Sequence, residues 1–139
     1  MLNQSSSHIV IFDKENKVLL LKRAENDEWE PGKWSIPGGR REKDETLHQN
    51  IVREVAEETG LTVYPQNIKF LSKISHKLNH IFFTTKKFDG KITLDHENSD
   101  YVWVKPEEID DKLSVPNLRE EVMEAKKLFA STITIKVTK

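Results

Sequence analysis

Residues 39–61 read GRREKDETLHQNIVREVAEETGL. Within this stretch three carboxylates lie three and four positions apart, at Glu54, Glu57 and Glu58. On a helix these positions share one face, where like charges repel one another. The last two also lie just before Gly60, a residue type that commonly ends helices, and the helix dipole disfavours anions at that end. Because local stability opposes this arrangement, the sequence predicts that a bound cation compensates for it.

Apolar residues recur along one side of the same segment and predict a helix over residues 45–59. Asp44 is the expected N-cap, and Gly60 is the expected residue just past the C-terminal end. On a helical projection Glu54 and Glu58 flank one edge of the apolar face. Their carboxylates are therefore expected to lie along the surface or in a cleft rather than point straight into solvent. The expected apolar face consists of Leu47, Ile51, Val52, Val55 and Ala56.

The remaining patterns predict a fold that mixes helices and strands. The first two strands flank a turn at residues 13–16 and suggest a β-hairpin. A second amphipathic helix is expected over residues 116–130, and the alternating tail 132–137 suggests a last strand, in the domain's own sheet or across a dimer. Helices against a mixed sheet are the expected architecture. The expected strands are residues 8–12, 18–23, 68–75, 81–88 and 101–105.

Bulk composition is typical of one soluble domain spanning residues 1–139. The 22 basic and 23 acidic side chains give a net charge of -1, which argues against a general nucleic-acid or anionic-membrane binder. The chain has no cysteine, which excludes disulfides and thiolate sites and suits a cytoplasmic location. We find no signal peptide and no apolar run near the roughly 20 residues that cross a bilayer. A small-molecule substrate is expected, and monomer and homodimer stay open.

The three carboxylates have the chemistry of a metal site. Carboxylate oxygens are hard ligands that suit Mg²⁺ or Mn²⁺. Because Mg²⁺ keeps several waters and shares its sphere with phosphates, we expect a di- or triphosphate substrate. Such a metal would lower the pKa of a bound water and align it for attack on phosphorus. Nearby, Arg53 could pair with Glu45, and Gly38 and Gly39 allow the backbone to approach a metal or phosphate closely.

Each of these features alone has a simpler explanation. A glutamate-rich helix face is usually a solvated surface, an arginine beside it a surface ion pair, and Pro-Gly-Gly an ordinary turn. Their joint occurrence is different. Seven fixed residue types at these spacings would match by chance on the order of once in 10⁸ or 10⁹ starting positions.

Over its full length the segment 39–61 resembles the Nudix box of the Nudix hydrolase superfamily, G-x5-E-x7-R-E-V-x-E-E-x-G-L. The preceding GKWSIPGG at 32–39 and the order of elements are also similar to this family. The resemblance implies an α/β fold of the α+β kind, an α/β/α sandwich around a mixed β-sheet. It also implies a pyrophosphohydrolase that uses Mg²⁺ or Mn²⁺ and water to cleave a nucleoside diphosphate linked to another group.

The resemblance implies roles for individual residues. Glu45 and Arg53 would brace the loop against the helix, and Gly39 would lie against the substrate. The general base varies across the family, between a box glutamate and a carboxylate on a distant loop. Four residues would hold the metal, the last through its carbonyl: Glu54, Glu57, Glu58 and Gly38.

Three residues outside the box resemble functional residues of MutT-like members. Glu97 lies six positions before Trp103, as an acidic residue does in those members, and is the candidate general base. The alternative is a solvated glutamate in an acidic loop. Arg23 resembles a phosphate-binding arginine, with a surface charge at a strand end as the alternative. Asn117 could read a base edge through its amide, with a helix N-cap as the alternative.

Other histidines and aromatics carry less weight. His76, His80 and His96 are spread over two strands and a loop, which disfavours a zinc site. Phe82 and Phe83 are neighbours on a strand and face opposite sides, so at most one of them lines a pocket.

The substrate is narrowed by markers that this chain lacks. ADP-ribose-type members carry a proline about 15 residues past the box, where this chain has His76. Dinucleoside-polyphosphate-type members carry a tyrosine at one of the following positions, where this chain has Lys77, Leu78 and Asn79. Elimination favours a MutT-like nucleoside triphosphate pyrophosphohydrolase. The alternatives are another nucleoside diphosphate derivative (nucleotide sugar, ADP-ribose or dinucleoside polyphosphate), coenzyme A, a diphosphoinositol, or a non-catalytic nucleotide sensor. Long RNA is disfavoured by the neutral charge.

Overall fold

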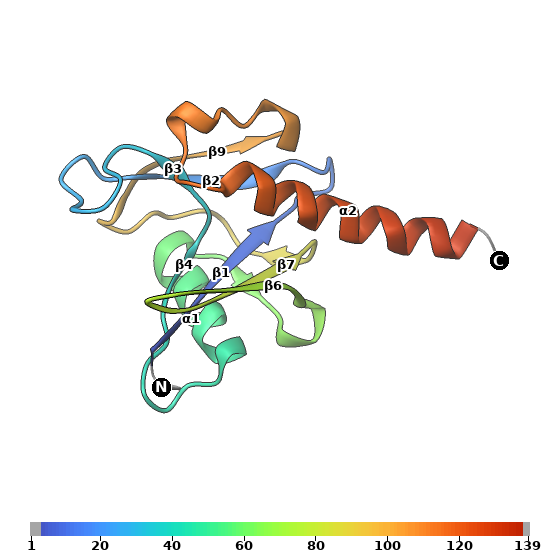
Figure 1. Cartoon of the computed structure of the whole chain (residues 1–139), viewed down its shortest axis with the longest axis horizontal. Helices are drawn as coiled ribbons and strands as arrows, with labels where there is room; N and C mark the ends of the chain where they lie inside the picture. Colours follow the sequence, from blue (N-terminus) through green and yellow to red (C-terminus); the bar gives the residue numbers. More distant parts are fainter. Residues whose placement is uncertain (1–3, 138–139) are drawn as a thin grey trace.

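The computed structural model describes residues 4–137 and the side chains of residues 4–130. Two α-helices and nine strands alternate along this part of the chain, with three short 3₁₀ turns between them (Figure 1). The elements are β1 (Ser5–Ile11), β2 (Val18–Arg23), β3 (Trp34–Ser35), β4 (Gly38–Arg40), α1 (Leu47–Thr59), β5 (Thr62–Val63), η1 (Pro65–Asn67), β6 (Lys69–His76), β7 (Leu78–Thr85), β8 (Phe88–Asp89), β9 (Asn98–Val104), η2 (Pro106–Glu108), η3 (Asp111–Leu113) and α2 (Leu118–Val137).

Two sheets carry most of the strands. One is mixed, with the order β4-β1-β7-β6, in which β1 runs parallel to β7 and antiparallel to β4. The other is antiparallel, with the order β3-β2-β9, and a small β5-β8 pair completes the strands described. The expected mixed sheet is confirmed. The expected hairpin of the first two strands is wrong, because β1 pairs with β4 and β7 on its two edges, and the only pairing toward β2 among the described residues is an isolated bridge between Phe12, just after β1, and Val18.

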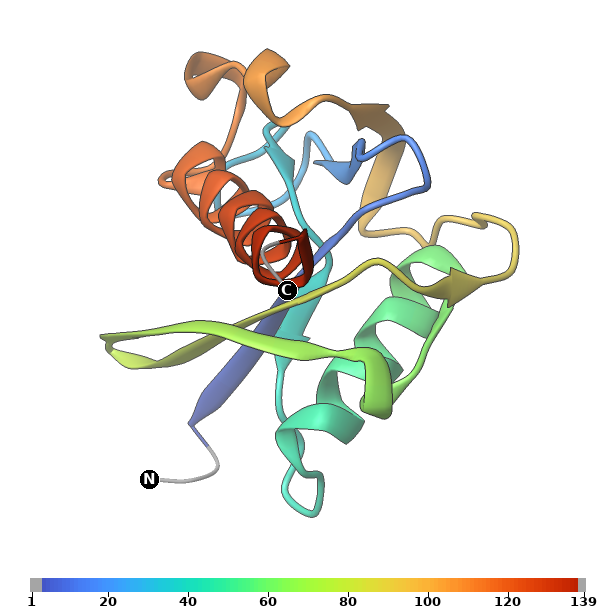
Figure 2. The same ribbon diagram turned by 90° about the vertical axis from the view of Figure 1, so that its right-hand side faces the viewer.

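Alternation along β1 creates the layers of the fold. Ile9 and Ile11 pack in one apolar cluster with residues of α1, whereas Val10 and Phe12 pack in a second cluster with residues of α2. Successive residues of a strand face opposite sides, so one apolar strand supplies both clusters. Figure 2 shows α1 and α2 on opposite sides of β1. The expected α/β/α sandwich is therefore confirmed.

Helix α1 starts later than expected. Its N-cap is Thr46 rather than Asp44, because Thr46 forms a capping box with Gln49. The Thr46 hydroxyl accepts a hydrogen bond from the Gln49 N–H at 3.0 Å, and the Gln49 side chain accepts one from the Thr46 N–H at 2.8 Å. At the other end Gly60 has the expected left-handed backbone, with φ 74°. The N–H of Gly60 donates to the carbonyl of Ala56.

The apolar face of α1 is narrower than the sequence suggests. Ile51 and Val55 are fully buried, but Ala56 is exposed. Asn50 is fully buried beside them, although its side chain is polar. The helix thus buries one amide next to its apolar residues, and this amide helps to build the site described below.

The C-terminal segment differs most from the sequence prediction. Residues 132–137 continue α2 instead of forming a strand. Figure 1 shows this end of α2 projecting beyond the sheets, away from any strand edge. A helix forms its backbone hydrogen bonds within itself, whereas a strand needs a neighbouring edge. Neither helix that the structure describes combines the length and apolarity needed to span a membrane.

Candidate active site

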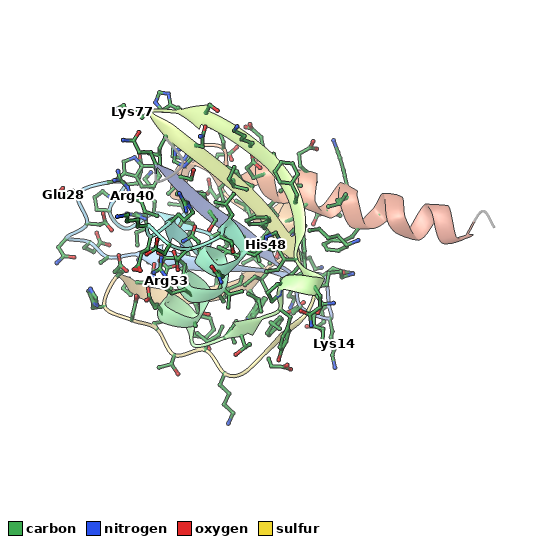
Figure 3. The ribbon with its side chains drawn as sticks, turned by 90° about the horizontal axis from the view of Figure 1, so that it is seen from below. Lys14, Glu28, Arg40, His48, Arg53 and Lys77 are labelled. Carbon is green, nitrogen blue, oxygen red and sulfur yellow. The ribbon has the colours of Figure 1, made fainter. Side chains whose placement is uncertain are left out.

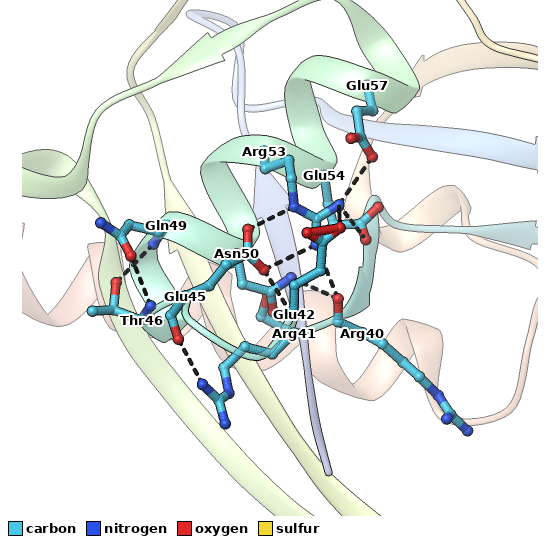
Figure 4. Close-up of polar contacts among 11 residues, drawn as sticks. Arg40, Arg41, Glu42, Glu45, Thr46, Gln49, Asn50, Arg53, Glu54 and Glu57 are labelled. Carbon is cyan, nitrogen blue, oxygen red and sulfur yellow. Dashed lines mark hydrogen bonds and ion pairs between the residues drawn. The ribbon is translucent and has the colours of Figure 1, made fainter. Parts of the chain in front are cut away.

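Arg53, in the middle of α1, is the central residue of a polar network that links the helix to the loop before it (Figure 4). Its guanidinium holds Glu45 with two hydrogen bonds, from Nε at 2.6 Å and from Nη2 at 3.0 Å. Its Nη1 donates to Glu57 at 3.0 Å and to Glu54 at 3.3 Å, and Nη2 also donates to the carbonyl of Arg40 at 3.0 Å. One side chain therefore ties the loop after β4 to two of the box carboxylates, and the predicted pair between Glu45 and Arg53 is present.

This network changes the acidity of its members. The hydrogen bonds from Arg53 hold the pKa of Glu45 below its ordinary value. The same bonds raise the pKa of Arg53. Both shifts favour the charged forms, so the pair stays ionised.

A second contact fixes the loop from the opposite end of α1. The N–H of Gly38 donates to Oε1 of Glu58 at 3.0 Å. Gly39 lies against Glu54, because a Cβ on Gly39 would be 2.2 Å from Oε2 of that side chain. A Cβ on Gly38 would be 2.3 Å from the carbonyl oxygen of Ser7. Only glycine permits these close approaches, and they place the backbone of β4 directly against the carboxylates.

A buried amide supports the same loop, and the sequence did not reveal this role. Asn50 accepts a hydrogen bond from the Ser7 hydroxyl at 2.5 Å and donates to the carbonyl of Arg40 at 3.1 Å. It thereby links β1, β4 and α1. The sequence signal that could have revealed this role was Asn50 itself, a polar residue next to the apolar positions of the predicted helix.

Burial raises the pKa values of two of the box carboxylates, Glu54 and Glu58. Glu58 is 9% exposed, and this burial raises its pKa to about 9. The hydrogen bond from Gly38 lowers the pKa of Glu58, whereas the charges of Glu54 and Glu97 raise it. Burial also raises the pKa of Glu54, although Arg53 opposes this shift. Among the ion pairs of the described side chains, none includes Glu58. Without a cation, Glu58 therefore keeps its proton at neutral pH, and a bound cation would favour its ionised form.

A cavity of about 940 Å³ opens beside these carboxylates. Figure 3 places Arg40 and Arg53 on the same side of the molecule as Glu28, away from the projecting end of α2. Glu54 and Glu57 are not among the cavity's lining residues and lie instead at Arg53. The predicted site residues that line the cavity are Arg23, Gly38, Gly39, Glu58, Glu97 and Asn117.

Glu97 is brought to the box by the fold. It lies in the loop just before β9, is exposed, and lines the cavity. Its charge contributes to the raised pKa of both Glu54 and Glu58. The loop is anchored by a hydrogen bond from the N–H of Ala24 to the carbonyl of Glu97 at 3.2 Å. A carboxylate distant in sequence therefore faces the same cavity end as the box.

Arg23 holds a loop that carries an aromatic side chain. Its Nη2 pairs with Asp27 at 2.7 Å, and its Nε donates to the carbonyl of Trp29 at 2.9 Å. The guanidinium also lies over the Trp29 ring, 4.9 Å from its centre. Trp29 is 54% exposed and lines the cavity. The sequence did not single out Trp29, although an aromatic residue in an otherwise polar loop was the signal that could have found it.

Asn117 holds the N-cap position of α2, because the helix begins at Leu118 and the carbonyl of Asn117 accepts from the N–H of Glu121 at 3.1 Å. Its φ is 67°, in the left-handed region rather than the extended region usual for N-caps. Asn117 also lines the cavity, so its position fits both predicted roles. Phe82 also lines the cavity and Phe83 is buried beside α1, so one member of that pair reaches the pocket.

Histidines form a further polar group in the cavity wall. The Ser6 hydroxyl lies 3.0 Å from Nε2 of His8 and 2.9 Å from Nδ1 of His80. The two ring nitrogens are 3.3 Å apart. Burial, with a smaller contribution from His80, lowers the pKa of His8 to about 4, so His8 is uncharged at neutral pH. The sequence signal that could have revealed this group was Ser6 and His8, two polar residues two positions apart on a strand that continues with apolar residues.

The box residues fit a hard divalent cation in kind and in charge. Among the described residues no three acidic, histidine or cysteine side chains already converge on a single point as ligands would. The donors are nevertheless all oxygens, as Mg²⁺ prefers. A cation near Glu54 and Glu58 would offset the burial and repulsion that raise their pKa values. The glycine backbone at residues 38–39 lies in close contact with Glu54, which places main-chain oxygens near the carboxylates.

Comparison with known proteins identifies the family. A family model described as NUDIX domain matches residues 2–126. A CTP pyrophosphohydrolase of Escherichia coli (strain K12) is 33% identical over 102 residues, which is 70% of this chain and 73% of that protein. A MutT-like protein of Streptomyces ambofaciens is 28% identical over 106 residues, 76% of this chain. The match covers 66% of that relative, slightly less than two thirds of its length.

The fold comparison agrees. The crystal structure of a MutT protein from Methanosarcina mazei Go1 matches with a TM-score of 0.74 at 28% identity, covering 88% of this chain and 92% of that one. The chain therefore belongs to the NUDIX domain family. One of its relatives is named a pyrophosphohydrolase, and its class is that of hydrolases acting on pyrophosphate bonds.

Proposed function

We propose that the protein is a Mg²⁺- or Mn²⁺-dependent enzyme that cleaves a pyrophosphate bond of a nucleoside triphosphate by attack of water on phosphorus. One observation carries this proposal. Glu58 is buried and unpaired by any cation of the described chain, and with Glu97 it lines a cavity large enough for a nucleotide, close enough to Glu54 that the two carboxylates repel each other. A divalent cation bound here together with phosphates would favour the ionised form of these carboxylates.

In this proposal the metal is held by Glu54, Glu57, Glu58 and the carbonyl of Gly38. When bound, it would neutralise phosphate charge and activate a water. Arg53 contributes indirectly, since its bonds to Glu45, Glu54 and Glu57 orient two ligands and hold the loop. Its role is to position other groups rather than to touch the reacting atoms.

Residues around the cavity divide the remaining tasks. Glu97 would take the proton of the attacking water, since an exposed carboxylate at the cavity edge can pass it on to solvent. Arg23, which lines the same cavity, would bind a phosphate, with Gly39 close to the same group. Asn117 would contact the base through its amide, and Trp29 would stack on it.

The nucleoside triphosphate class is supported by two observations. The Escherichia coli relative is named for CTP, and the lining of the cavity includes aromatic and amide side chains as well as charged ones. A non-catalytic nucleotide-sensing domain is the competing proposal. It predicts binding without release of pyrophosphate or phosphate.

The test is a Mg²⁺-dependent screen with product identification. Substrates are the nucleoside triphosphates, a nucleotide sugar, ADP-ribose, a dinucleoside polyphosphate and coenzyme A. Glu57→Gln and Glu58→Gln should each lower turnover about a hundredfold or more while the fold is kept. Glu124→Gln, on the exposed side of α2, is the matched control and should keep full activity. Near-normal turnover of either box variant would show that the site is assigned wrongly.

A further inference from the structure

The Ser6, His8 and His80 cluster depends on one strand pairing. Ser6 and His8 lie on β1, and His80 lies on β7 opposite Ser6 in the parallel register. Because 74 residues separate Ser6 from His80, only this pairing brings them together. The cluster lies in the cavity wall beside Phe82, whose ring stacks on His8 with centres 5.0 Å apart.

The outer edge of the His80 ring is available for a ligand. The cluster uses Nε2 of His8 and Nδ1 of His80. Nε2 of His80 has no hydrogen-bond partner among the described residues, and no described side chain has a buried polar atom without a partner, so this nitrogen is not sealed from solvent. Nδ1 of His8 instead lies against the backbone of Gly38, where a Cβ would be 2.6 Å from it.

The number of protons shared by Ser6, His8 and His80 limits which hydrogen bonds the outer ring nitrogens can form. Ser6 has one hydroxyl proton and can donate to one ring only. The other ring must then donate to Ser6, since two facing lone pairs at this distance repel. For two uncharged rings the outer nitrogens therefore never both carry a proton. They present one donor and one acceptor, or two acceptors. Exchanging the two rings' roles takes a proton passed through Ser6 together with a proton lost at one outer nitrogen and one gained at the other, both exchanged with solvent.

We propose that His80, oriented by Ser6 and His8, reads the edge of a nucleobase in this cavity. A base edge carries hydrogen-bond donors and acceptors, and Nε2 of His80 can meet either kind, according to which nitrogen of its ring carries the proton. The preferred substrates are therefore nucleotides that carry a base, with either an amino or a keto edge, rather than base-free pyrophosphates. Ser6 and His8 are positioning residues. This inference rests on the nucleoside triphosphatase proposed above.

The experiment compares three substrates: CTP, UTP and ribose 5-triphosphate, which has the same phosphates but no base. His80→Phe removes the outer nitrogen and keeps the ring's shape, whereas His80→Gln keeps a polar group near that position. Ser6→Ala removes the relay hydroxyl. His96→Gln is the control, because His96 is exposed and outside the cavity. We measure kcat and KM separately, and thermal unfolding reports on the fold.

His80→Phe should raise KM for CTP and UTP by roughly tenfold or more, with kcat nearly unchanged, and by a similar factor for both bases. Its KM for ribose 5-triphosphate should not change. Ser6→Ala should raise KM for CTP and UTP less, and His80→Gln should keep part of the wild-type affinity. Equal KM values for wild type and His80→Phe on CTP and UTP would overturn the inference alone. A wild type that hydrolyses no nucleoside triphosphate would instead overturn the proposed function.

Discussion

Arg53 and Glu45 form a two-point ion pair, with Nε and Nη2 of the guanidinium 2.6 and 3.0 Å from the two carboxylate oxygens. Both side chains are mostly buried. We expect a double-mutant cycle of Arg53→Lys and Glu45→Gln to give a coupling energy of about 1–3 kcal/mol in the free energy of unfolding, because lysine cannot reproduce the paired geometry.

The same cycle should also appear in turnover, since Arg53 orients Glu54 and Glu57. Denaturant unfolding and kcat measured on the same four proteins check both effects. A coupling energy near zero in unfolding would mean that the pair does not hold the loop against α1.

Gly38 and Gly39 should respond differently to the same substitution. In Gly39→Ala the new Cβ would be 2.2 Å from Oε2 of Glu54, a side chain that can move aside. We expect turnover to fall about a hundredfold with little loss of stability. In Gly38→Ala the Cβ would be 2.3 Å from the backbone oxygen of Ser7, which cannot move freely. We expect this variant to lose about 1–3 kcal/mol of stability.

Thermal unfolding and activity measured side by side separate these two outcomes. Normal turnover in Gly39→Ala would argue against Glu54 as a metal ligand. Unchanged stability in Gly38→Ala would contradict the close packing of β4 on β1.

Glu58 should make the metal-free protein less stable as pH rises. Its pKa of about 9 in the folded protein lies above the ordinary value of 4.5, so the folded state holds its proton more tightly than the unfolded state. The stabilisation is complete below about pH 4.5 and is lost as pH rises toward 9. In chelator we expect wild type to lose about 5 kcal/mol, relative to Glu58→Gln, between pH 5 and pH 9.

Denaturant unfolding across this range checks the effect, and added Mg²⁺ should reverse it for wild type but not for Glu58→Gln. Parallel pH profiles for the two proteins would contradict the raised pKa.

Glu97→Gln tests the proposed general base. We expect kcat to fall roughly 10²- to 10⁴-fold, with loss of the acidic limb of the pH–rate profile and little change in KM. Asp100→Asn, in the same acidic stretch but outside the cavity lining, is the control. If Glu97→Gln keeps both its rate and its pH profile, a box glutamate is the base instead.

Trp29→Ala tests the aromatic contact at the cavity mouth. Trp29 is 54% exposed, so its loss should change stability by less than about 1 kcal/mol. KM for nucleoside triphosphates should rise about tenfold, since stacking on a base contributes on the order of 1–3 kcal/mol. Tyr101→Ala is the matched control, because Tyr101 is also an exposed aromatic but does not line the cavity. Equal KM values for the two variants would exclude stacking by Trp29.

Features of α1 could be predicted with high fidelity because they depend on residues close in sequence. The left-handed Gly60 follows from the conformational freedom of glycine, and the pair between Arg53 and Glu45 joins the helix to the loop directly before it, eight positions away. The N-cap was misplaced by two residues, since Asp44 and Thr46 are both suitable caps and only the contact with Gln49 decides between them. The alternating polar and apolar residues at 132–137 led to a wrong strand prediction for a different reason. A strand needs a neighbouring strand edge to pair with, and no local pattern reveals whether one is present.

The sequence by itself determined the family of this protein and the face of α1 that carries its carboxylates, because both are set by spacings within 23 consecutive residues. Tertiary structure alone decided what meets those carboxylates. Glu97 reaches them from the loop before β9, and His80 reaches Ser6 through the register of β7 on β1. Such contacts depend on which strands pair and how both sheets pack, and these are properties of the whole core rather than of any short segment.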